Sequence, residues 1–242
     1  MFTWDGVGLG EDGTLWGGEA LLGRPGSWRR VCSIRPFRLP GGDKAGREPW
    51  RSAAAVTWEA GREWADCPDP DDIARQAWSR NLNCLETSAV GRLFDAAAAL
   101  ILGKTHVSFE AEGPMLLESM CRDSANPVLV PLEKDALGIW RADWQPLVQQ
   151  MADDGRSPGL RAEIFHASMA QIVLKQAQAV RNEHGVDVVG LGGGVFQNRV
   201  LASQAISLLE GDGFDVRMPG VLPVNDAGLS FGQAAELAAR EN

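Results

Sequence analysis

A glycine-rich segment near the carboxyl end of the chain has the residue types of a nucleotide-binding loop. The continuous apolar run 186–191 is typical of a strand buried on both faces, and Gly192, Gly193 and Gly194 follow it directly. A loop without side chains lets a ligand approach the backbone closely, and the helix expected after Asn198 offers unpaired N–H groups. Glycine loops after strands also serve tight turns, so these residues alone leave both interpretations open.

The histidines and cysteines show no spacing that indicates a catalytic or metal-binding set. His106, His166 and His184 are scattered, and His166, beside Phe165 on an expected core helix, is interpreted as a structural histidine. The cysteines form no CxxC pair, which argues against a zinc site and a disulfide framework. We interpret them as free thiols: Cys32, Cys67, Cys84 and Cys121.

Composition and charge are those of an acidic globular protein. A chain of 242 residues with 45% hydrophobic content buries a substantial core. The net charge of −9 argues against a basic surface that grips nucleic acid, so no nucleic-acid partner is expected. No apolar run approaches the roughly 20 residues that cross a bilayer, and the first residues do not resemble a signal peptide. We therefore expect no membrane partner and a cytoplasmic location.

The elements that must position the glycine loop begin with an antiparallel meander. A first strand at residues 2–4, a turn around Asp12-Gly13 and a return strand to residue 22 precede a third strand over residues 28–37. Pro49 opens a helix. Further helices are expected over residues 73–82, from Thr87 to an end at Gly103, and over 115–120 and 161–184. The loop is then followed by a helix to residue 209, a strand at 214–218 and a helix at 226–239.

Five sequence blocks, in one order along almost the whole chain, resemble the carboxy-terminal part of the hydrogenase maturation carbamoyltransferase family, HypF. The first block joins residues 4–8 to residues 16–19, and the second joins residues 35–43 to residues 47–51. The remaining three blocks are Gly91-Arg92-Leu93-Phe94-Asp95, Gly192-Gly193-Gly194-Val195-Phe196-Gln197-Asn198, and Leu222-Pro223 with Asn225-Asp226 and Gly232-Gln233.

The resemblance implies an α/β fold of the actin-like and sugar-kinase (ASKHA) class. Its lobe is a three-stranded antiparallel meander extended into a mixed sheet with helices on both faces. Residues 1–242 are then expected to form a single nucleotide-binding lobe of the Kae-like carbamoyltransferase domain. The amino-terminal lobe, the acylphosphatase, zinc-finger and adenylate-forming regions of the family, and its His-rich metal motif are expected to be absent from this chain.

The implied activity is transfer of a carbamoyl group from carbamoyl-adenylate to the carboxy-terminal cysteine of HypE during [NiFe]-hydrogenase maturation. ATP or carbamoyl-adenylate and a divalent metal ion of unspecified identity are the implied cofactors. The implied partners are HypE and a separate chain that supplies the amino-terminal lobe. Without the metal-binding histidines, independent enzymatic activity stays an open question. Two alternatives are a catalytically incomplete nucleotide-binding or HypE-docking module and an O-carbamoyltransferase with a hydroxyl acceptor.

The resemblance assigns two aspartates to a divalent metal ion beside the nucleotide phosphates. Asp5 and Asp226 match the positions of metal ligands in similar proteins, and carboxylate oxygens suit such an ion. From position alone, Asp5 is a hairpin-turn aspartate and Asp226 a helix N-cap. Val7 departs from the threonine often found between the two glycines, which removes a hydroxyl contact to phosphate.

Five further residues are assigned to the nucleotide itself. Asp95 and Glu118 fall where related transferases place carboxylates on the ribose hydroxyls, although the residues just before Glu118 depart from the family pattern. Gly193 and Gly194 are expected to let the nucleotide approach the backbone. Asn198 is expected to supply an amide donor and acceptor to the nucleotide, or alternatively to cap the following helix.

Overall fold

The amino-terminal strands form the expected antiparallel meander. In the computed structural model, which describes residues 1–241, β1 (Phe2–Leu9) pairs with β2 (Leu15–Arg24), and β2 pairs with β3 (Ser27–Ile34). Asp12 closes the first hairpin, because its Oδ1 accepts hydrogen bonds from the Thr14 backbone and hydroxyl. The β1–β2 register shifts between Trp4 and Gly8. This bulge takes Asp5 and Gly6 out of the regular ladder.

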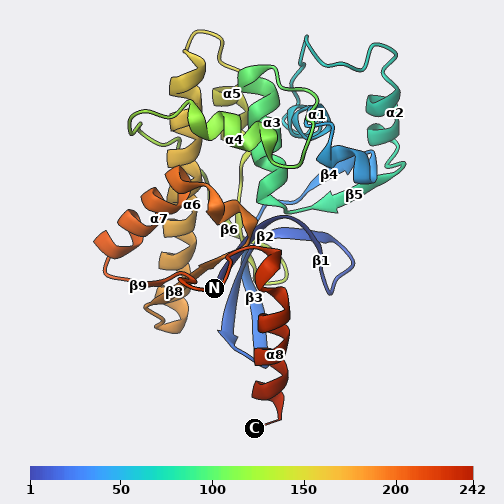
Figure 1. Ribbon diagram of the computed structural model, residues 1–242. Coiled ribbons are helices and arrows are strands. Elements are labelled where there is room, and N and C mark those ends of the chain that lie inside the picture. The colour runs from blue at the N-terminus through green and yellow to red at the C-terminus, as the bar shows by residue number, and fades with distance from the viewer. Residues whose placement is uncertain (242) are drawn as a thin grey trace.

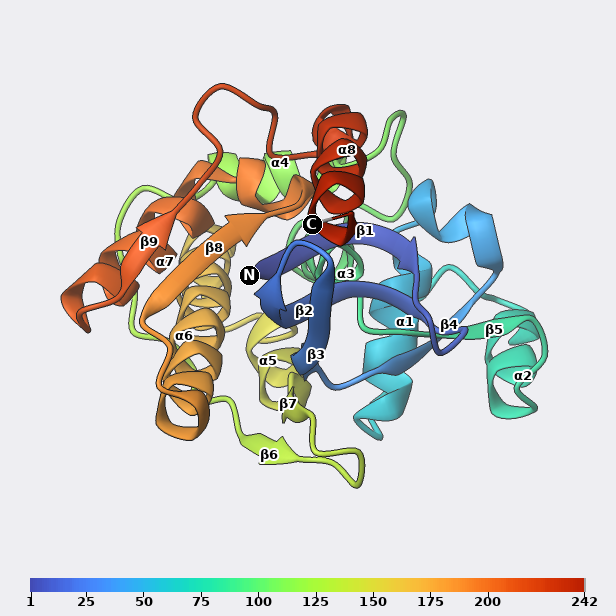
Figure 2. The same ribbon diagram turned by 90° about the horizontal axis from the view of Figure 1, so that it is seen from below.

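The meander extends into a mixed sheet whose order is β6-β7-β3-β2-β1-β8-β9 (Figure 1). β8 (Val188–Gly192) runs parallel to β1, and β9 (Asp215–Arg217) runs parallel to β8 (Figure 2). On the other side, β7 (Trp140–Ala142) pairs parallel with β3 and antiparallel with β6 (Leu132–Lys134). The glycine loop therefore leaves the sheet beside the strand that carries Asp5.

Two short strands at the edge change the expected boundaries. The third strand ends at Ile34, and the chain resumes after Arg35-Pro36 as β4 (Phe37–Pro40), because proline cannot donate to a ladder. β4 pairs antiparallel with β5 (Cys84–Thr87), which the sequence analysis did not predict. The alanine-rich helix begins at Val90, after β5, and Gly103 is its C-cap.

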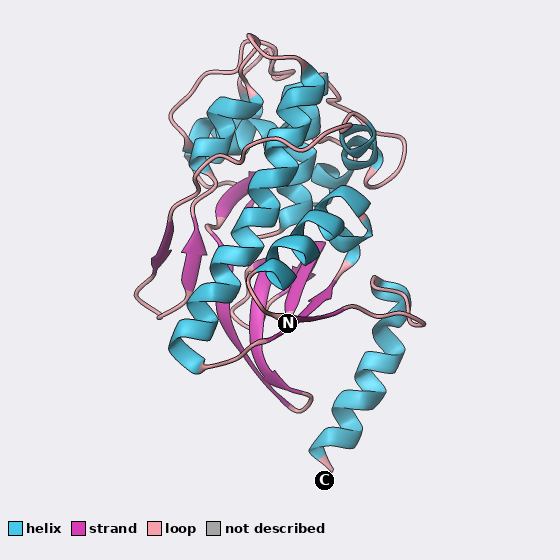
Figure 3. Ribbon diagram, turned by 90° about the vertical axis from the view of Figure 1, so that its left-hand side faces the viewer, coloured by secondary structure: helices cyan, strands magenta, loops and turns pink. Residues whose placement is uncertain are grey.

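Most helices gather above the sheet, whereas the last helix stands apart from them (Figure 3). Capping residues set the ends of the longest helix, since the Ser157 hydroxyl accepts from Leu160 N and Gly185 adopts a left-handed conformation. The helices are α1 (Trp50–Glu59), α2 (Ile73–Ser79), α3 (Val90–Leu102), α4 (Glu112–Ser119), α5 (Gln145–Met151), α6 (Pro158–His184), α7 (Arg199–Gly211) and α8 (Leu229–Arg240); short 3-10 turns lie at Gly42–Gly46, Gly194–Gln197 and Asp226–Gly228.

Aromatic pairs lock together the elements that border the glycine loop. Trp4 of β1 stacks on Phe196 just after the loop, with ring centroids 5.5 Å apart. Phe94 of α3 packs edge-on against Phe165 of α6 at 4.9 Å. All four side chains are buried in one continuous core. Buried aromatic contacts of this kind hold β1, the loop, α3 and α6 in a fixed arrangement.

The carboxy-terminal helix α8 is the least buried helix of the described chain. None of its residues is buried, and Leu229, Phe231 and Leu237 are exposed. It runs beside the β2–β3 hairpin (Figure 1), where the Glu236 carboxylate accepts hydrogen bonds from Gly26 N and the Trp28 indole. Among residues 1–241, no helix combines the length and apolar character needed to cross a membrane.

Candidate functional site

A cleft of about 1110 Å³ opens between β1, α3, α4, the glycine loop and the start of α7. Segments far apart in the sequence form its walls, including the 3-10 turn that contains Asp226. Gly193 does not line the cleft; its N–H donates to the Val224 carbonyl over 2.8 Å. Six of the seven residues assigned from the sequence line the cleft: Asp5, Asp95, Glu118, Gly194, Asn198 and Asp226.

The glycine loop passes so close to β1 that Gly193 excludes a side chain and Gly194 leaves little room for one. Gly193 has a φ of 98°, and a Cβ there would lie 2.2 Å from the Trp4 carbonyl oxygen. A Cβ on Gly194 would lie 3.0 Å from Asp5 Oδ1 and 4.0 Å from Asn225 Cβ. The loop backbone therefore runs directly between Asp5 and the turn that carries Asp226.

Asp5 and Asp226 are both available to a ligand on this side of the cleft. Asp5 Oδ1 accepts a hydrogen bond from Gly6 N at 2.7 Å. Asn225 caps the 3-10 turn that contains Asp226, because its side chain accepts from Ala227 N at 3.2 Å, and Asp226 is exposed. The interpretation of Asp226 as a helix N-cap is therefore wrong, since α8 begins at Leu229 after Gly228.

The donor set at these two aspartates suits a hard cation that takes its other ligands from a nucleotide. Magnesium is typically held by one or two carboxylates together with substrate phosphates and water. Within residues 1–241 no group of three or more His, Cys, Asp and Glu side chains is placed to hold a metal ion. Asp5 and Asp226 therefore fit a shared metal site of this type and do not fit a complete protein cage.

Asp95 is a buried carboxylate at the floor of the cleft. Its exposed fraction is 3%, and Arg92 Nη1 lies 2.9 Å from Asp95 Oδ2. That oxygen nevertheless accepts no hydrogen bond of favourable geometry from the described residues. Burial raises the pKa of Asp95 to about 7; Arg92 opposes this rise and Glu110 adds to it. The sequence analysis missed Arg92 as a site residue, although the i,i+3 spacing to Asp95 was visible.

Asn198 caps the helix that follows the loop, the alternative that the sequence left open. Its Oδ1 accepts from Leu201 N at 2.9 Å, which caps α7, and its Nδ2 lies 2.9 Å from His166 Nε2. His166 Nδ1 donates to the Ala162 carbonyl at 2.8 Å, so Nε2 accepts from the Asn198 amide. Burial lowers the pKa of His166, which keeps this ring neutral. Asn198 therefore positions the loop and helix while bordering the cleft.

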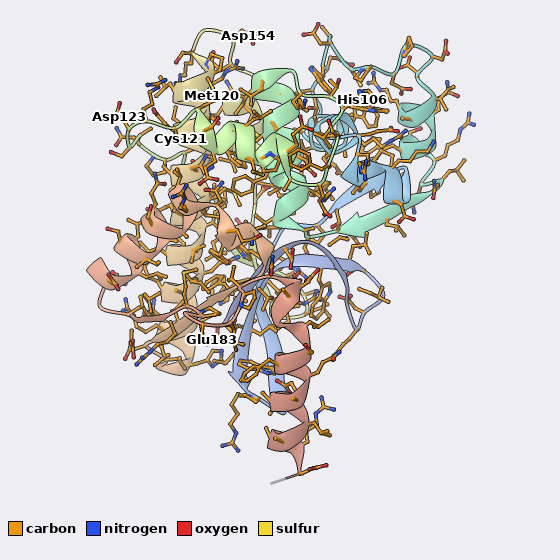
Figure 4. All side chains as sticks on the ribbon, viewed as in Figure 1. His106, Met120, Cys121, Asp123, Asp154 and Glu183 are labelled. Atoms are coloured by element: carbon orange, nitrogen blue, oxygen red, sulfur yellow. The ribbon has the colours of Figure 1, made fainter. Side chains whose placement is uncertain are left out.

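His166 is the buried structural residue that the sequence analysis expected. Its ring is fully buried and packs edge-on against Phe94. Cys121 lies just after α4 (Figure 4). Its thiol is 3.4 Å from His166 Nδ1. Burial raises the pKa of Cys121 to about 12, so this cysteine is a protonated packing partner at neutral pH.

Glu118 links α4 to α7 across the cleft. Its Oε1 accepts a hydrogen bond from Arg199 N at 2.8 Å, in the first turn of α7. An acidic side chain at a helix start satisfies an N–H group that the helix itself leaves unpaired. Glu118 is thus half-buried at the cleft wall with one oxygen already bonded to the protein.

A family model and curated relatives match nearly the whole chain. Residues 1–233 match the model described as "Carbamoyltransferase, Kae1-like Domain, second subdomain". Carbamoyltransferase HypF of Rhodobacter capsulatus is 38% identical, over 98% of this chain and 32% of the relative. A carbamoyltransferase HypF homolog of Cupriavidus necator is 35% identical, over 95% of this chain and 62% of the relative.

Solved structures agree with these relatives. A full-length HypF crystallised in a phosphate- and nucleotide-bound form matches with a TM-score of 0.93 and 30% identity, over 98% of this chain and 32% of that one. HypF from T. kodakarensis matches with a TM-score of 0.84 and 26% identity, over 99% of this chain and 34% of that one. The chain thus spans about a third of both solved structures. It belongs to the HypF carbamoyltransferase family, in whose Kae1-like domain it corresponds to the second subdomain.

Proposed function

We propose that this chain forms the nucleotide-holding half of a carbamoyltransferase site that acts in [NiFe]-hydrogenase maturation. The observation that carries the proposal is the convergence of the assigned residues, from five separate segments, on one cleft. The matched relatives are named carbamoyltransferases, which supports the same reaction class. The nucleotide is ATP or carbamoyl-adenylate, bound with its phosphates toward the glycine loop and β1.

The nucleotide is held by carboxylates on one side and backbone on the other. The carboxylate of buried Asp95, whose Oδ2 faces Arg92 without a hydrogen bond of favourable geometry, accepts a hydrogen bond from a ribose hydroxyl. Glu118 offers its second oxygen to the same sugar. Gly193 and Gly194 leave room for close approach to the backbone, and Asn198 keeps the loop in place through its bonds to Leu201 N and His166.

Asp5 and Asp226 would hold a divalent metal ion beside the phosphates. When bound, such an ion supplies positive charge that stabilises negative charge developing on phosphate and carbonyl oxygens. The bond from Gly6 N fixes one oxygen of Asp5, whereas exposed Asp226 lies on the short turn after Asn225. These residues orient the phosphate end of the nucleotide at the mouth of the cleft.

The reaction itself is acyl transfer without a protein nucleophile. The acceptor thiolate, on the carboxy-terminal cysteine of HypE, bonds to the carbonyl carbon of carbamoyl-adenylate. The bond from that carbon to the phosphate oxygen breaks, and AMP leaves with the electron pair. What this half-site contributes is orientation of the donor and an environment that favours the departing phosphate.

The site as encoded here is one wall of a larger cleft. The second wall and the metal-binding histidines are those of the amino-terminal lobe, and the complete site acts in the cytoplasm. Asp5 and Asp226 offer two carboxylates, so the ion takes its other ligands from that lobe, the nucleotide and water. A nucleotide-binding or HypE-docking module without turnover is the second candidate.

Mass spectrometry of the acceptor tests the proposed function. The purified chain is incubated with carbamoyl-adenylate, Mg²⁺ and HypE, with and without a polypeptide carrying the amino-terminal lobe. We expect one carbamoyl group on the terminal cysteine only when both lobes are present. A HypE variant with Ser in place of that cysteine is the acceptor control.

Each other outcome changes the proposal in a definite way. Transfer by the chain alone would contradict the half-site account. No transfer with both lobes, together with retained nucleotide binding, would favour the docking module. Transfer to the serine variant or to an added aminoglycoside hydroxyl would identify an O-carbamoyltransferase.

A further inference from the structure

Arg92 is a buried arginine on the cleft wall that the proposed function leaves without a role. Its side chain is 7% exposed, yet it lines the cleft. Nη1 lies 2.9 Å from Asp95 Oδ2, and Nη2 donates to Glu110 Oε1 over 3.4 Å. Its Nε–H has no hydrogen-bond partner among the described residues. A buried cation with an unused donor is costly unless a ligand completes its surroundings.

Small residues clear the space around the guanidinium. A Cβ on Gly6 would lie 3.3 Å from Arg92 Nη2, and one on Gly46 would lie 3.6 Å from Nη1. Gly91 brings the start of α3 against β1, since a Cβ there would lie 2.7 Å from Gly6 Cα. Larger side chains at Gly6 or Gly91 would separate the guanidinium from the bulged backbone of β1.

The start of α3 adds unpaired backbone donors at the same place. α3 has 13 residues, and its N-cap, Ala89, provides no side-chain hydrogen bond to the first turn. The first N–H groups of a helix have no intrahelical partner and carry partial positive charge. The Arg92 N–H already donates to the Ala89 carbonyl at 3.2 Å, so the Gly91 N–H and the Arg92 guanidinium are the donors at this corner of the cleft, beside Gly6.

The charged residues that line the cleft are mainly acidic, and the corner at Arg92 is where the cleft carries buried positive charge. Five carboxylates line it, from Asp5, Asp95, Glu110, Glu118 and Asp226, against two guanidinium groups, from Arg92 and Arg199. Arg199 is exposed, whereas Arg92 is buried. An anionic ligand entering an acidic cleft needs local positive charge, and a buried arginine provides it with less screening than a surface one.

We propose that Arg92 and the amino terminus of α3 form an anion subsite that contacts a phosphoryl oxygen of the bound nucleotide. This inference rests on the proposed function. Asp95 and Arg92, one helical turn apart, then contact different parts of the nucleotide. The carboxylate takes the ribose hydroxyls, and the guanidinium takes the phosphate that follows the sugar, with Asp95 and Glu110 fixing the plane of its fork.

Paired titrations with AMP and adenosine test this subsite, because the two ligands differ only in the phosphate. We expect Arg92→Gln to weaken AMP binding by about tenfold to a hundredfold in isothermal titration, as for a lost charge-assisted contact. Adenosine binding should change by less than about twofold. Arg92→Lys should fall between wild type and Arg92→Gln, since a lysine keeps the charge without the planar fork. Arg217→Gln, which removes an exposed guanidinium outside the cleft, is the matched control and should leave both affinities unchanged.

The outcomes separate this inference from the proposed function. Wild-type protein that binds neither ligand would overturn both. Wild-type binding of both ligands, with equal losses in Arg92→Gln, would overturn the subsite and leave the proposed function standing. Because Arg92→Gln leaves Asp95 without its cation, the double variant Arg92→Gln/Asp95→Asn is measured in parallel. If its AMP affinity matches that of Asp95→Asn alone, Arg92 makes no contact with phosphate.

Discussion

Two buried carboxylates of this protein lie in very different surroundings. Glu19 of β2 is 1% exposed and accepts from four donors, namely Gly17 N, Gly18 N and the hydroxyls of Ser33 and Ser88. Asp95 of α3 is 3% exposed, has one ion-pair partner and keeps an oxygen without a hydrogen bond. Burial alone therefore does not distinguish them.

The difference indicates which carboxylate is structural and which is available to a ligand. Hydrogen bonds to both oxygens of Glu19 compensate its burial, and they fix the glycine pair where β2 passes under α3. Asp95 lacks this compensation, and its raised pKa is the consequence. Incomplete satisfaction of a buried group at a cleft is the expected signature of a binding site.

The largest effect is expected from exchanging the Glu19 carboxylate for an amide. Glu19→Gln places NH₂ hydrogens against existing donors and should lower the free energy of unfolding by about 2–5 kcal/mol. The matched variant Asp95→Asn should lower it by less, about 1–2 kcal/mol, because the amide oxygen can still accept from the Arg92 guanidinium although the negative charge beside that buried cation is lost. Urea denaturation of both variants provides the measurement. Equal destabilisation would remove the distinction between the two sites.

Stability should also depend on pH through Asp95. The pKa of this carboxyl is about 7 in the folded protein, against 3.8 as its ordinary value. Between these values the folded chain keeps a proton that the unfolded chain has lost, so the stability contributed by this group falls as pH rises from about 4 to 7. The slope is at most about 1.4 kcal/mol per pH unit.

Comparison with Asp95→Asn isolates this contribution. The pKa of His166 is lowered by burial, so its own effect runs the other way and destabilises the protein as pH falls. His166 is unchanged in the variant, and its contribution cancels in the difference. Denaturation curves of wild type and Asp95→Asn should diverge between pH 4 and 7, and parallel curves would argue against a raised pKa at Asp95.

Nucleotide affinity should be reduced more by substitution of Asp95 than of Glu19, the reverse of the order expected for stability. Asp95→Asn should weaken ATP binding by about tenfold, because an amide is a poorer acceptor for a ribose hydroxyl. Glu19→Gln lies outside the cleft and should retain wild-type affinity at a temperature where it is folded. Calorimetric titration measures both. A larger loss in the Glu19 variant would show that the site depends on β2 more than on Asp95.

The smallest effect is expected from single donors to Glu19. Ser33→Ala removes a 3.1 Å hydrogen bond to Oε1 and should cost about 1 kcal/mol of unfolding free energy. Ser79→Ala, which removes an exposed hydroxyl on α2, should change stability by less than about 0.5 kcal/mol. If both substitutions cost the same in thermal or urea unfolding, the bonds to Glu19 carry no special stability.

Sequence patterns predicted the long elements of the fold better than the short ones. The meander, the strand before the glycine loop and α6 have clear periodicity or turn residues, and the structure contains them. Short elements contain little repetition and were found unevenly: β9 and α2 were predicted, whereas β5, β6, β7 and α5 were missed. Pairing with distant strands determines these elements.

The same limit applies to the site. Family motifs pointed to Asp95 and Gly193. Asp95 and Gly194, the residue after Gly193, both line the cleft. Nothing local showed that the Asn198 amide would bond to His166, 32 residues away. Glu19 did carry a signal, since a lone acid within the apolar run of residues 15–22 must find partners when buried. The identity of those partners depends on tertiary packing.

A crystal structure of this chain with AMP and Mg²⁺ would show whether this cleft is the nucleotide site. We expect density for the nucleotide in the cleft, with a ribose hydroxyl within about 3 Å of an Asp95 oxygen and the phosphate beside Gly194. Glu19 should keep its four donors unchanged. A nucleotide bound elsewhere, or a ribose out of reach of Asp95, would contradict the assignment of this cleft as the nucleotide site.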